Sequence, residues 1–144
     1  METKIKIKAV GYDGYKVDCK YVAVVDDEGV ISESIRRLVD TRIPRGAFIE
    51  VFDAFSGIAG RMLGVDIAKV NVTEIRFSGK DDSEGVILKG KLDTEFGNAK
   101  FTTPRLKYQI SESAEAADTT VEVTRLYDEV KRYLDGESAD LEEL

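Results

Sequence analysis

The sequence predicts a single α+β domain: an antiparallel sheet of about five strands with helices packed on one face. Three observations predict it. Several runs alternate apolar and polar residues, as strands with one buried face do. Two longer segments place apolar residues at the i, i+3, i+4, i+7 spacing of an amphipathic helix. A hairpin-sized turn separates the first two alternating runs, so these strands are antiparallel. The expected element order is ββ-α-α-βββ-α, with residues 1–136 as the domain and 137–144 as an acidic C-terminal tail.

The first two strands are expected at residues 4–10 and 15–25, joined by a turn at 11–14. In the first, Ile5, Ile7 and Ala9 alternate with lysines. The second is expected to turn five residues inward, namely Tyr15, Val17, Cys19, Tyr21 and Ala23, and to leave Lys16, Asp18 and Lys20 on the opposite side. The apolar side chains of this hairpin are therefore predicted to face the core and the lysines to face outward.

Two helices are expected next. Ser32 is a plausible N-cap for a short helix that would place Ile35, Leu38 and Val39 on one side, and Pro44 follows it. Residues 47–63 then form the clearest amphipathic pattern in the chain, and Gly64 ends it.

Three more strands are expected at residues 67–78, 86–92 and 100–108. The apolar phase of the first slips by one residue near Thr73, which predicts a β-bulge. Pro104 marks the last strand as an edge strand or as broken at that point. Residues 111–118 are expected to be a linker, and Thr119 or Thr120 to cap a final helix that Gly136 ends.

Composition excludes several kinds of catalytic and metal site. The chain has no histidine and one cysteine, Cys19, so His/Cys zinc sites, Ser-His-Asp triads and Cys-His dyads lack a required member. We therefore expect a protein that is not an enzyme, binds no metal and needs no cofactor. The N-terminus has no apolar signal core and no stretch approaches 18 apolar residues, which predicts a cytoplasmic protein without membrane contact.

Charge is distributed unevenly along the chain. Residues 1–108 carry 18 Lys/Arg against 17 Asp/Glu, whereas residues 109–144 carry 3 against 11. A nearly neutral body with an acidic last quarter suggests two surfaces of opposite character, which either bind each other or compete for a partner.

The alternation places several lysines on one side of the sheet, which makes that side a candidate site for single-stranded nucleic acid. These residues are Lys4, Lys6, Lys8, Lys16, Lys20, Lys89, Lys91 and Lys100. Such a group can neutralise phosphates, with strongly salt-dependent binding. The alternative is a solvated face whose lysines discourage edge pairing. Interleaved aromatic residues, on which bases stack, are not expected there, since Tyr15 and Tyr21 fall on the buried phase.

Two further features are candidate protein-binding surfaces. The tail ends in Asp140, Leu141, Glu142, Glu143 and Leu144, an acidic and apolar mixture that can dock on a basic groove of another protein, cover this protein's own lysines, or only solubilise the chain. On the long helix, Gly57 and Gly60 lie on one side with Gly64. Glycines there favour close backbone approach by another layer of this protein, by a homodimer partner or by a ligand, and a kink is the other explanation.

Two segments resemble small, uncharacterised proteins of bacteriophages and prophages. One runs from Val72-Thr73-Glu74-Ile75 through Gly79-Lys80-Asp81-Asp82 to Gly85-Val86-Ile87-Leu88-Lys89-Gly90; the other is Tyr127-Asp128-Glu129-Val130-Lys131-Arg132-Tyr133-Leu134-Asp135-Gly136. The resemblance covers about a third of the chain. It implies a phage origin and an accessory role near DNA replication, recombination or counter-defence.

The sequence thus favours a non-catalytic, phage-type accessory protein that binds another protein. The alternative is weak binding of single-stranded nucleic acid on the lysine-rich side of the sheet, modulated by the acidic C-terminus.

Overall fold

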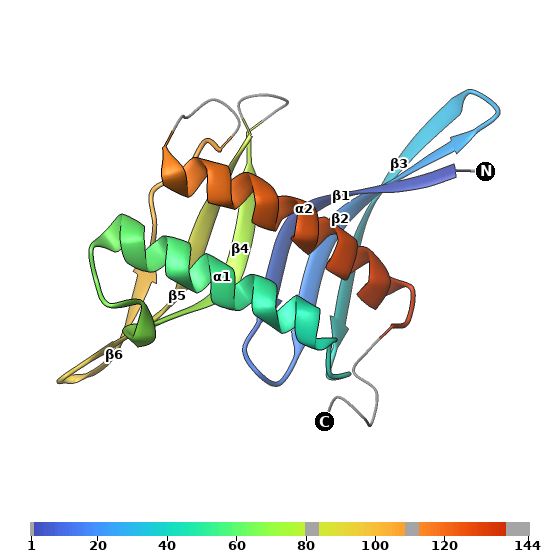
Figure 1. Ribbon diagram of the computed structural model, residues 1–144. Coiled ribbons are helices and arrows are strands. Elements are labelled where there is room, and N and C mark those ends of the chain that lie inside the picture. Colours follow the sequence, from blue (N-terminus) through green and yellow to red (C-terminus); the bar gives the residue numbers. More distant parts are fainter. Residues whose placement is uncertain (1, 80–83, 109–112, 138–144) are drawn as a thin grey trace.

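The computed structural model describes residues 2–79, 84–108 and 113–137, and over these residues it is a six-stranded antiparallel sheet with two α-helices on one face (Figure 1). The spatial order of the strands is β3-β2-β1-β4-β5-β6. The elements are β1 (Glu2–Tyr12), β2 (Val17–Asp27), β3 (Val30–Asp40), α1 (Gly46–Leu63), the 3-10 helix η1 (Ile67–Lys69), β4 (Val70–Ser78), β5 (Gly85–Thr94), β6 (Gly97–Thr102) and α2 (Ala114–Leu134). The predicted α+β class is confirmed, and the sheet has one strand more than expected.

The additional strand is β3, where the sequence analysis expected a short helix. β3 pairs with β2 along its whole length, from Val17 opposite Asp40 to Asp27 opposite Val30. A two-residue turn joins the two strands as a hairpin. Glu28 and Gly29 both have positive φ, at 52° and 85°, as a type I′ hairpin turn requires. The predicted helix is therefore wrong, and the order of the main elements is βββ-α-βββ-α.

The hydrophobic core lies between the helices and the face of the sheet that they cover, which we call the inner face (Figure 1). α1 contributes Phe48 and Phe55, α2 contributes Leu126 and Tyr133, and strands from both halves of the sheet complete the layer. α1 ends as predicted, since Gly64 adopts the left-handed conformation that closes the helix.

Two β-bulges set which side chains face the core. The bulge predicted near Thr73 is confirmed, because the register between β4 and β5 shifts between Val72 and Glu74. A second bulge, which the sequence analysis missed, lies at Lys8 in β1. It moves Val10 to the inner face and Ala9 to the opposite, outer face, so the expectation that Ala9 faces the core with Ile7 is wrong.

The two halves of the sheet meet along a short junction between β1 and β4. Only three residues of β1, Ala9 to Gly11, pair with β4. Side chains from the helices bind backbone groups beside this junction: the Tyr127 hydroxyl accepts a hydrogen bond from the N–H of Ile7 (3.0 Å), and the Ser56 hydroxyl from the N–H of Val72 (2.9 Å). The helices therefore supply partners that strand pairing lacks there.

The C-terminal helix starts earlier than predicted. Ser113 is its N-cap and accepts a hydrogen bond from the N–H of Ala116 at 3.1 Å. Thr119 and Thr120 lie inside the helix, where their hydroxyls donate to carbonyls four residues earlier. The expected cap at these threonines is wrong, and residues 114–118 are helical rather than a linker.

Candidate interaction surfaces

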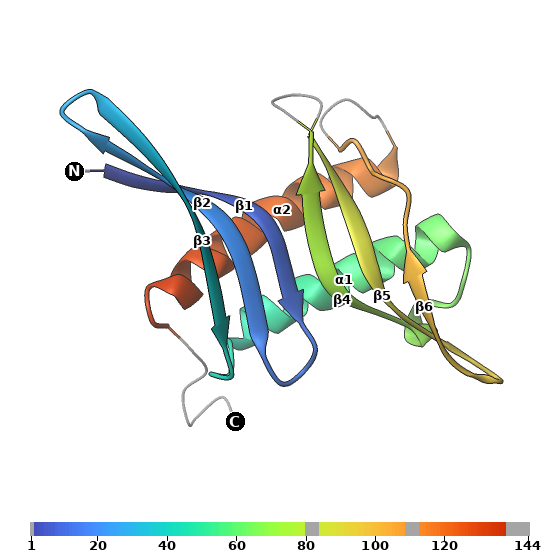
Figure 2. The same cartoon turned by 180° about the vertical axis from the view of Figure 1, so that it is seen from behind.

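The first candidate surface is the outward side of β3, which forms one edge of the sheet. Ile35 is 90% exposed and Ile31 is 66% exposed, and both project from the outer face, which Figure 2 shows with the two helices behind it. Val39 is also exposed on the same face, and half-buried Val22 of β2 lies opposite Ile35. We call β3 with these side chains the β3 surface. A cluster of apolar side chains on a regular edge strand is typical of an interaction site.

The backbone of β3 is also available for pairing. Asp27 and Val30 close a two-residue hairpin, and such a closing pair is hydrogen-bonded. Hydrogen-bonded and non-hydrogen-bonded pairs alternate along an antiparallel ladder, so the odd-numbered residues from 31 to 39 do not bond to β2. Their N–H and C=O groups point to the open side of β3, where no described strand lies.

Charged residues occupy the alternate outward positions of β3. Glu33 and Arg37 flank Ile35, and all three project from the outer face. Arg37 donates two hydrogen bonds to the Asp18 carboxylate of β2, at 2.9 and 2.6 Å. This contact holds the pKa of Asp18 below its usual value. It also fixes the guanidinium on the outer face, beside the apolar side chains.

The second candidate surface is the lysine-rich part of the outer face. The strand registers place six of the predicted lysines on it: Lys4, Lys6, Lys20, Lys89, Lys91 and Lys100. Lys16 lies in the turn beside Lys20, and Lys8 occupies the β1 bulge. Tyr15 is 74% exposed in that turn, so the expectation that it is buried is wrong.

Two adjacent hollows lie along the middle of the outer face. One has a volume of about 200 Å³ and is lined in part by Gly11, Lys16 and Lys20; the other, of about 300 Å³, is lined by Lys89, Lys91 and Lys100 among others. Thr73 and Glu74 line both. Gly11 lines the first hollow and Gly90 the second, so backbone atoms form part of each.

The carboxylates beside these lysines are already bound to other groups. Asp13 accepts hydrogen bonds from the N–H groups of Tyr15 and Lys16, which lower its pKa, and Glu74 pairs with Arg76 at 3.1 Å. Within residues 2–79, 84–108 and 113–137, every ion pair uses an arginine. The lysine ammonium groups therefore form no ion pair with another described residue and can meet an anionic ligand.

The two glycines predicted as a partner site have different environments. Gly60 is buried, and its carbonyl accepts a hydrogen bond from the N–H of Val65 at 3.0 Å, which is part of the C-cap of α1. Gly57 is half-buried, and a Cβ added there would have no atom within 4 Å. The structure thus supports close packing within the chain at Gly60 and leaves open space at Gly57. The predicted tail residues, from Asp140 to Leu144, lie outside the described residues.

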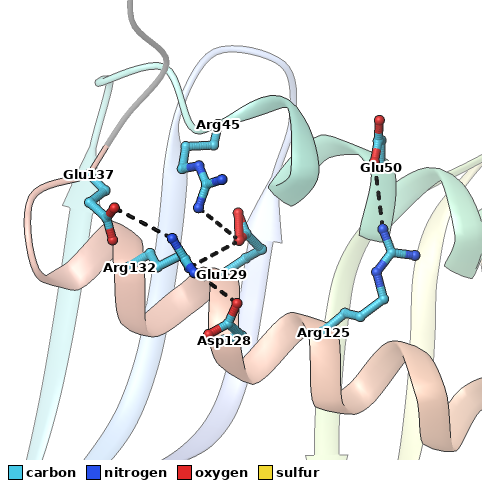
Figure 3. A network of polar contacts seen from close by, with 7 residues as sticks. All are labelled: Arg45, Glu50, Arg125, Asp128, Glu129, Arg132 and Glu137. Carbon is cyan, nitrogen blue, oxygen red and sulfur yellow. Dashed lines mark hydrogen bonds and ion pairs between the residues drawn. The ribbon is translucent and has the colours of Figure 1, made fainter.

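A network of charges connects the two helices (Figure 3). Buried Glu129 of α2 pairs with Arg45, at the start of α1, at 3.4 Å and with Arg132 at 3.8 Å. Farther along, Arg125 of α2 pairs with Glu50 of α1 at 3.6 Å. We assign this network a structural role, since it joins the helices and leaves Glu129 compensated by two cations.

In the described ranges, no three His, Cys, Asp or Glu residues lie close enough to hold a metal ion. No described helix is both long and apolar enough to cross a membrane. Comparison with protein-family models, with curated proteins and with solved structures finds no match to this chain.

The β3 surface was not predicted, although the sequence contains a signal for it. Residues Ile31, Glu33, Ile35, Arg37 and Val39 alternate with Ser32, Ser34 and Arg36, and a glycine-containing turn precedes them. Leu38 and Val39 also follow Ile35 at spacings of three and four, and this pattern favoured a helix.

Proposed function

We propose that the protein is a non-catalytic, cytoplasmic module that binds another polypeptide chain through the β3 surface. The observation that carries the proposal is an eleven-residue edge strand with Ile35 exposed at its centre. Such a strand offers main-chain hydrogen bonds to an added strand, and its alternate side chains provide specificity. The non-catalytic role rests on the lack of histidine and on a single cysteine that is buried.

Burial of the exposed side chains would supply much of the binding free energy. Full burial of one isoleucine side chain is worth about 1.5–3 kcal/mol, so Ile31 and Ile35 are the principal apolar contacts. The resemblance to phage-encoded accessory proteins suggests a partner within an infected bacterial cell. The acidic tail remains a second proposed contact, and deletion of residues 137–144 tests it separately.

Capture by an immobilised chain tests the proposal. Three baits are compared: the wild type, Ile35→Asp and the control Phe96→Asp, which changes an equally exposed residue (93%) at the distant β5–β6 turn. Each is incubated with a bacterial extract to which an untagged copy of the chain is added. We expect wild type and Phe96→Asp to retain a polypeptide that Ile35→Asp does not. Retention of the same polypeptides by all three baits would overturn the proposal.

A second candidate function, weak binding of single-stranded nucleic acid, is favoured by the lysines on the outer face that lack ion-pair partners. Fluorescence anisotropy with a labelled oligonucleotide at low salt tests it. Replacement of Lys89, Lys91 and Lys100 by glutamine should weaken binding and reduce its salt dependence. The control replaces three other exposed lysines, Lys69, Lys107 and Lys131, so that net charge changes equally. Equal effects of the two triple variants, or no binding even without residues 137–144, would exclude this function.

A further inference from the structure

We propose that the occupant of the β3 surface is β3 of a second copy of this chain, paired antiparallel about a two-fold axis that passes through Ile35. This inference rests on the proposed function, because it names the polypeptide that the β3 surface binds. It follows from three properties of β3: the direction of its free backbone groups, the order of its outward side chains and their charges.

The backbone groups fit this pairing. In a two-fold pair centred on Ile35, Ile35 faces Ile35 of the second copy, Glu33 faces Arg37 and Ile31 faces Val39. All of these are odd-numbered residues, whose N–H and C=O groups point to the open edge. Each of them therefore meets a residue of the second copy with which it can exchange hydrogen bonds.

The side chains are self-complementary in the same register. On the outer face the cross-strand pairs would be apolar at the centre, oppositely charged on either side of it, and apolar again at both ends. Pairs of this kind each stabilise an antiparallel ladder by about 0.2–1 kcal/mol. Arg37 can contact Glu33 of the second copy because its hydrogen bonds to Asp18 already hold the guanidinium on this face.

Neighbouring registers lack this complementarity. If the axis passed through Ser34, Glu33 would face Ile35. If it passed through Arg36, Ile35 would face Arg37 and Glu33 would face Val39. Both alternatives place a charged group opposite an apolar one, which leaves the charge without a partner. The order of residues along β3 thus selects one register among those that the backbone allows.

Such a dimer would form one continuous sheet from two chains. A two-fold axis perpendicular to the sheet keeps both outer faces on the same side, so the lysine-rich surfaces of the two copies would lie side by side. Because a single pair of edge strands is a small interface, we expect a dimer that forms at micromolar or higher concentration.

Light scattering and sedimentation of the purified full chain, between about 10 and about 500 µM, test the dimer. Wild type and Phe96→Asp should shift from monomer to dimer with concentration, whereas Ile35→Asp should remain monomeric because two carboxylates would face each other. Glu33→Arg alone should raise the dissociation constant about tenfold, because it creates two like-charged contacts. Arg37→Glu is added to Glu33→Arg in a chain that also carries Asp18→Asn, because Asp18 would otherwise repel a carboxylate at position 37. This combination should restore the constant of the Asp18→Asn chain, a rescue that simple damage to β3 would not give.

A cysteine substitution tests the register. In the Ile35→Cys variant the two thiols would lie opposite each other, with Cα atoms about 5.5 Å apart, within the range that a disulfide bridges. Mild oxidation should therefore link two chains. Glu33→Cys is the control, because its two cysteines would be separated by roughly four residues along the strands, or about 13 Å. The native Cys19 is buried and burial raises the pKa of its thiol to about 12, so it does not contribute.

The outcomes separate this inference from the proposed function. A dimer that Ile35→Asp abolishes and Ile35→Cys links supports both. A chain that stays monomeric throughout the concentration range, while Ile35-dependent capture retains a different protein, overturns the dimer and leaves the proposed function intact. A dimer that is insensitive to Ile35→Asp, or one that Glu33→Cys links instead of Ile35→Cys, also overturns the inference.

Discussion

The two edge strands of the sheet differ in how readily a strand of another chain could pair with them. β6, at one edge, has only six residues, and Pro104 follows soon after it. Beyond β6, the chain continues along β5: Leu106 bridges to Val86, and Thr103 exchanges hydrogen bonds with Leu88 through its backbone and its hydroxyl. β3, at the other edge, has eleven residues and no proline.

This difference favours the β3 edge over the β6 edge as the place of the pairing that we propose. Short strands, proline and covering segments are common devices that prevent strands of other chains from adding to an edge. The β6 edge combines the first two, a short strand and a nearby proline. The β3 edge instead has exposed Ile35 between Glu33 and Arg37, two residues of opposite charge. This order of side chains matches the β3 partner strand that we propose. The following predictions test this contrast.

The largest expected effect is on the β4–β5 pair that supports the β6 edge. A Cβ at Gly90 would collide with the backbone carbonyl of Asn71, so Gly90→Val should lower the free energy of unfolding by about 3 kcal/mol or more. Denaturant unfolding of the purified variant measures it. Gly57→Ala is the control, since it adds a Cβ in open space within a helix and should stabilise by about 0.5–1 kcal/mol. Wild-type stability of Gly90→Val would contradict the close approach.

The second prediction concerns the hydrogen bond between Thr103 and Leu88, which holds the segment after β6 against β5. Thr103→Val keeps the shape of the buried side chain but removes the hydroxyl that accepts the Leu88 N–H at 3.0 Å. We expect a loss of about 1–3 kcal/mol, because a buried donor is left without an acceptor. Thermal and denaturant unfolding measure it. Thr102→Val, at an exposed neighbouring position, should change stability by less than about 0.5 kcal/mol. Equal effects at the two threonines would argue against a role for this hydrogen bond.

The third prediction compares the edges by amide hydrogen exchange at low and high protein concentration. The odd-numbered amides of β3 should become about tenfold more protected at high concentration, since pairing would cover them, while those of β6 should not change. Mass spectrometry of peptides from the two strands measures the difference. Protection that rises equally in β3 and β6 would indicate nonspecific association.

The smallest effect concerns the contact between Asp18 and Arg37. Because Arg37 lowers the pKa of Asp18 in the folded chain, this contact stabilises fully above the unfolded pKa near 3.8 and is lost as pH falls through the lower folded value. The stability difference between wild type and Asp18→Asn should therefore be small and should shrink below pH 3.8. Unfolding curves from pH 7 to about 3 measure it. A difference that grows in acid would contradict this assignment.

Local patterns in the sequence predicted much of the fold. The long helix and its end at Gly64, the bulge near Thr73 and the break before Pro104 are all confirmed. Each depends on residues close together in the chain. The start of α2 was missed although Ser113 is an ordinary N-cap residue, because the threonines six and seven residues later offered an equally common signal.

The candidate site was predicted less completely. Most lysines of the outer face followed from alternation, and the β1 bulge altered that alternation from Lys8 onward, at Ala9 and Val10. The β3 surface did not follow, because its apolar residues satisfy helical and strand spacing alike. The type I′ turn at Glu28 and Gly29 decided between them by placing β3 directly against β2.

By itself, the sequence determined which strands have one buried face, where the principal helix ends and that the first hairpin separates apolar from cationic side chains. These properties depend on the period of side chains along a strand or helix, which is local information. The tertiary structure alone decided the strand order, the short β1–β4 junction covered by Ser56 and Tyr127, and the open edge at β3. Such features depend on which distant segments pair, and the hydrogen bonds and buried area that select a pairing arise only once the chain has folded.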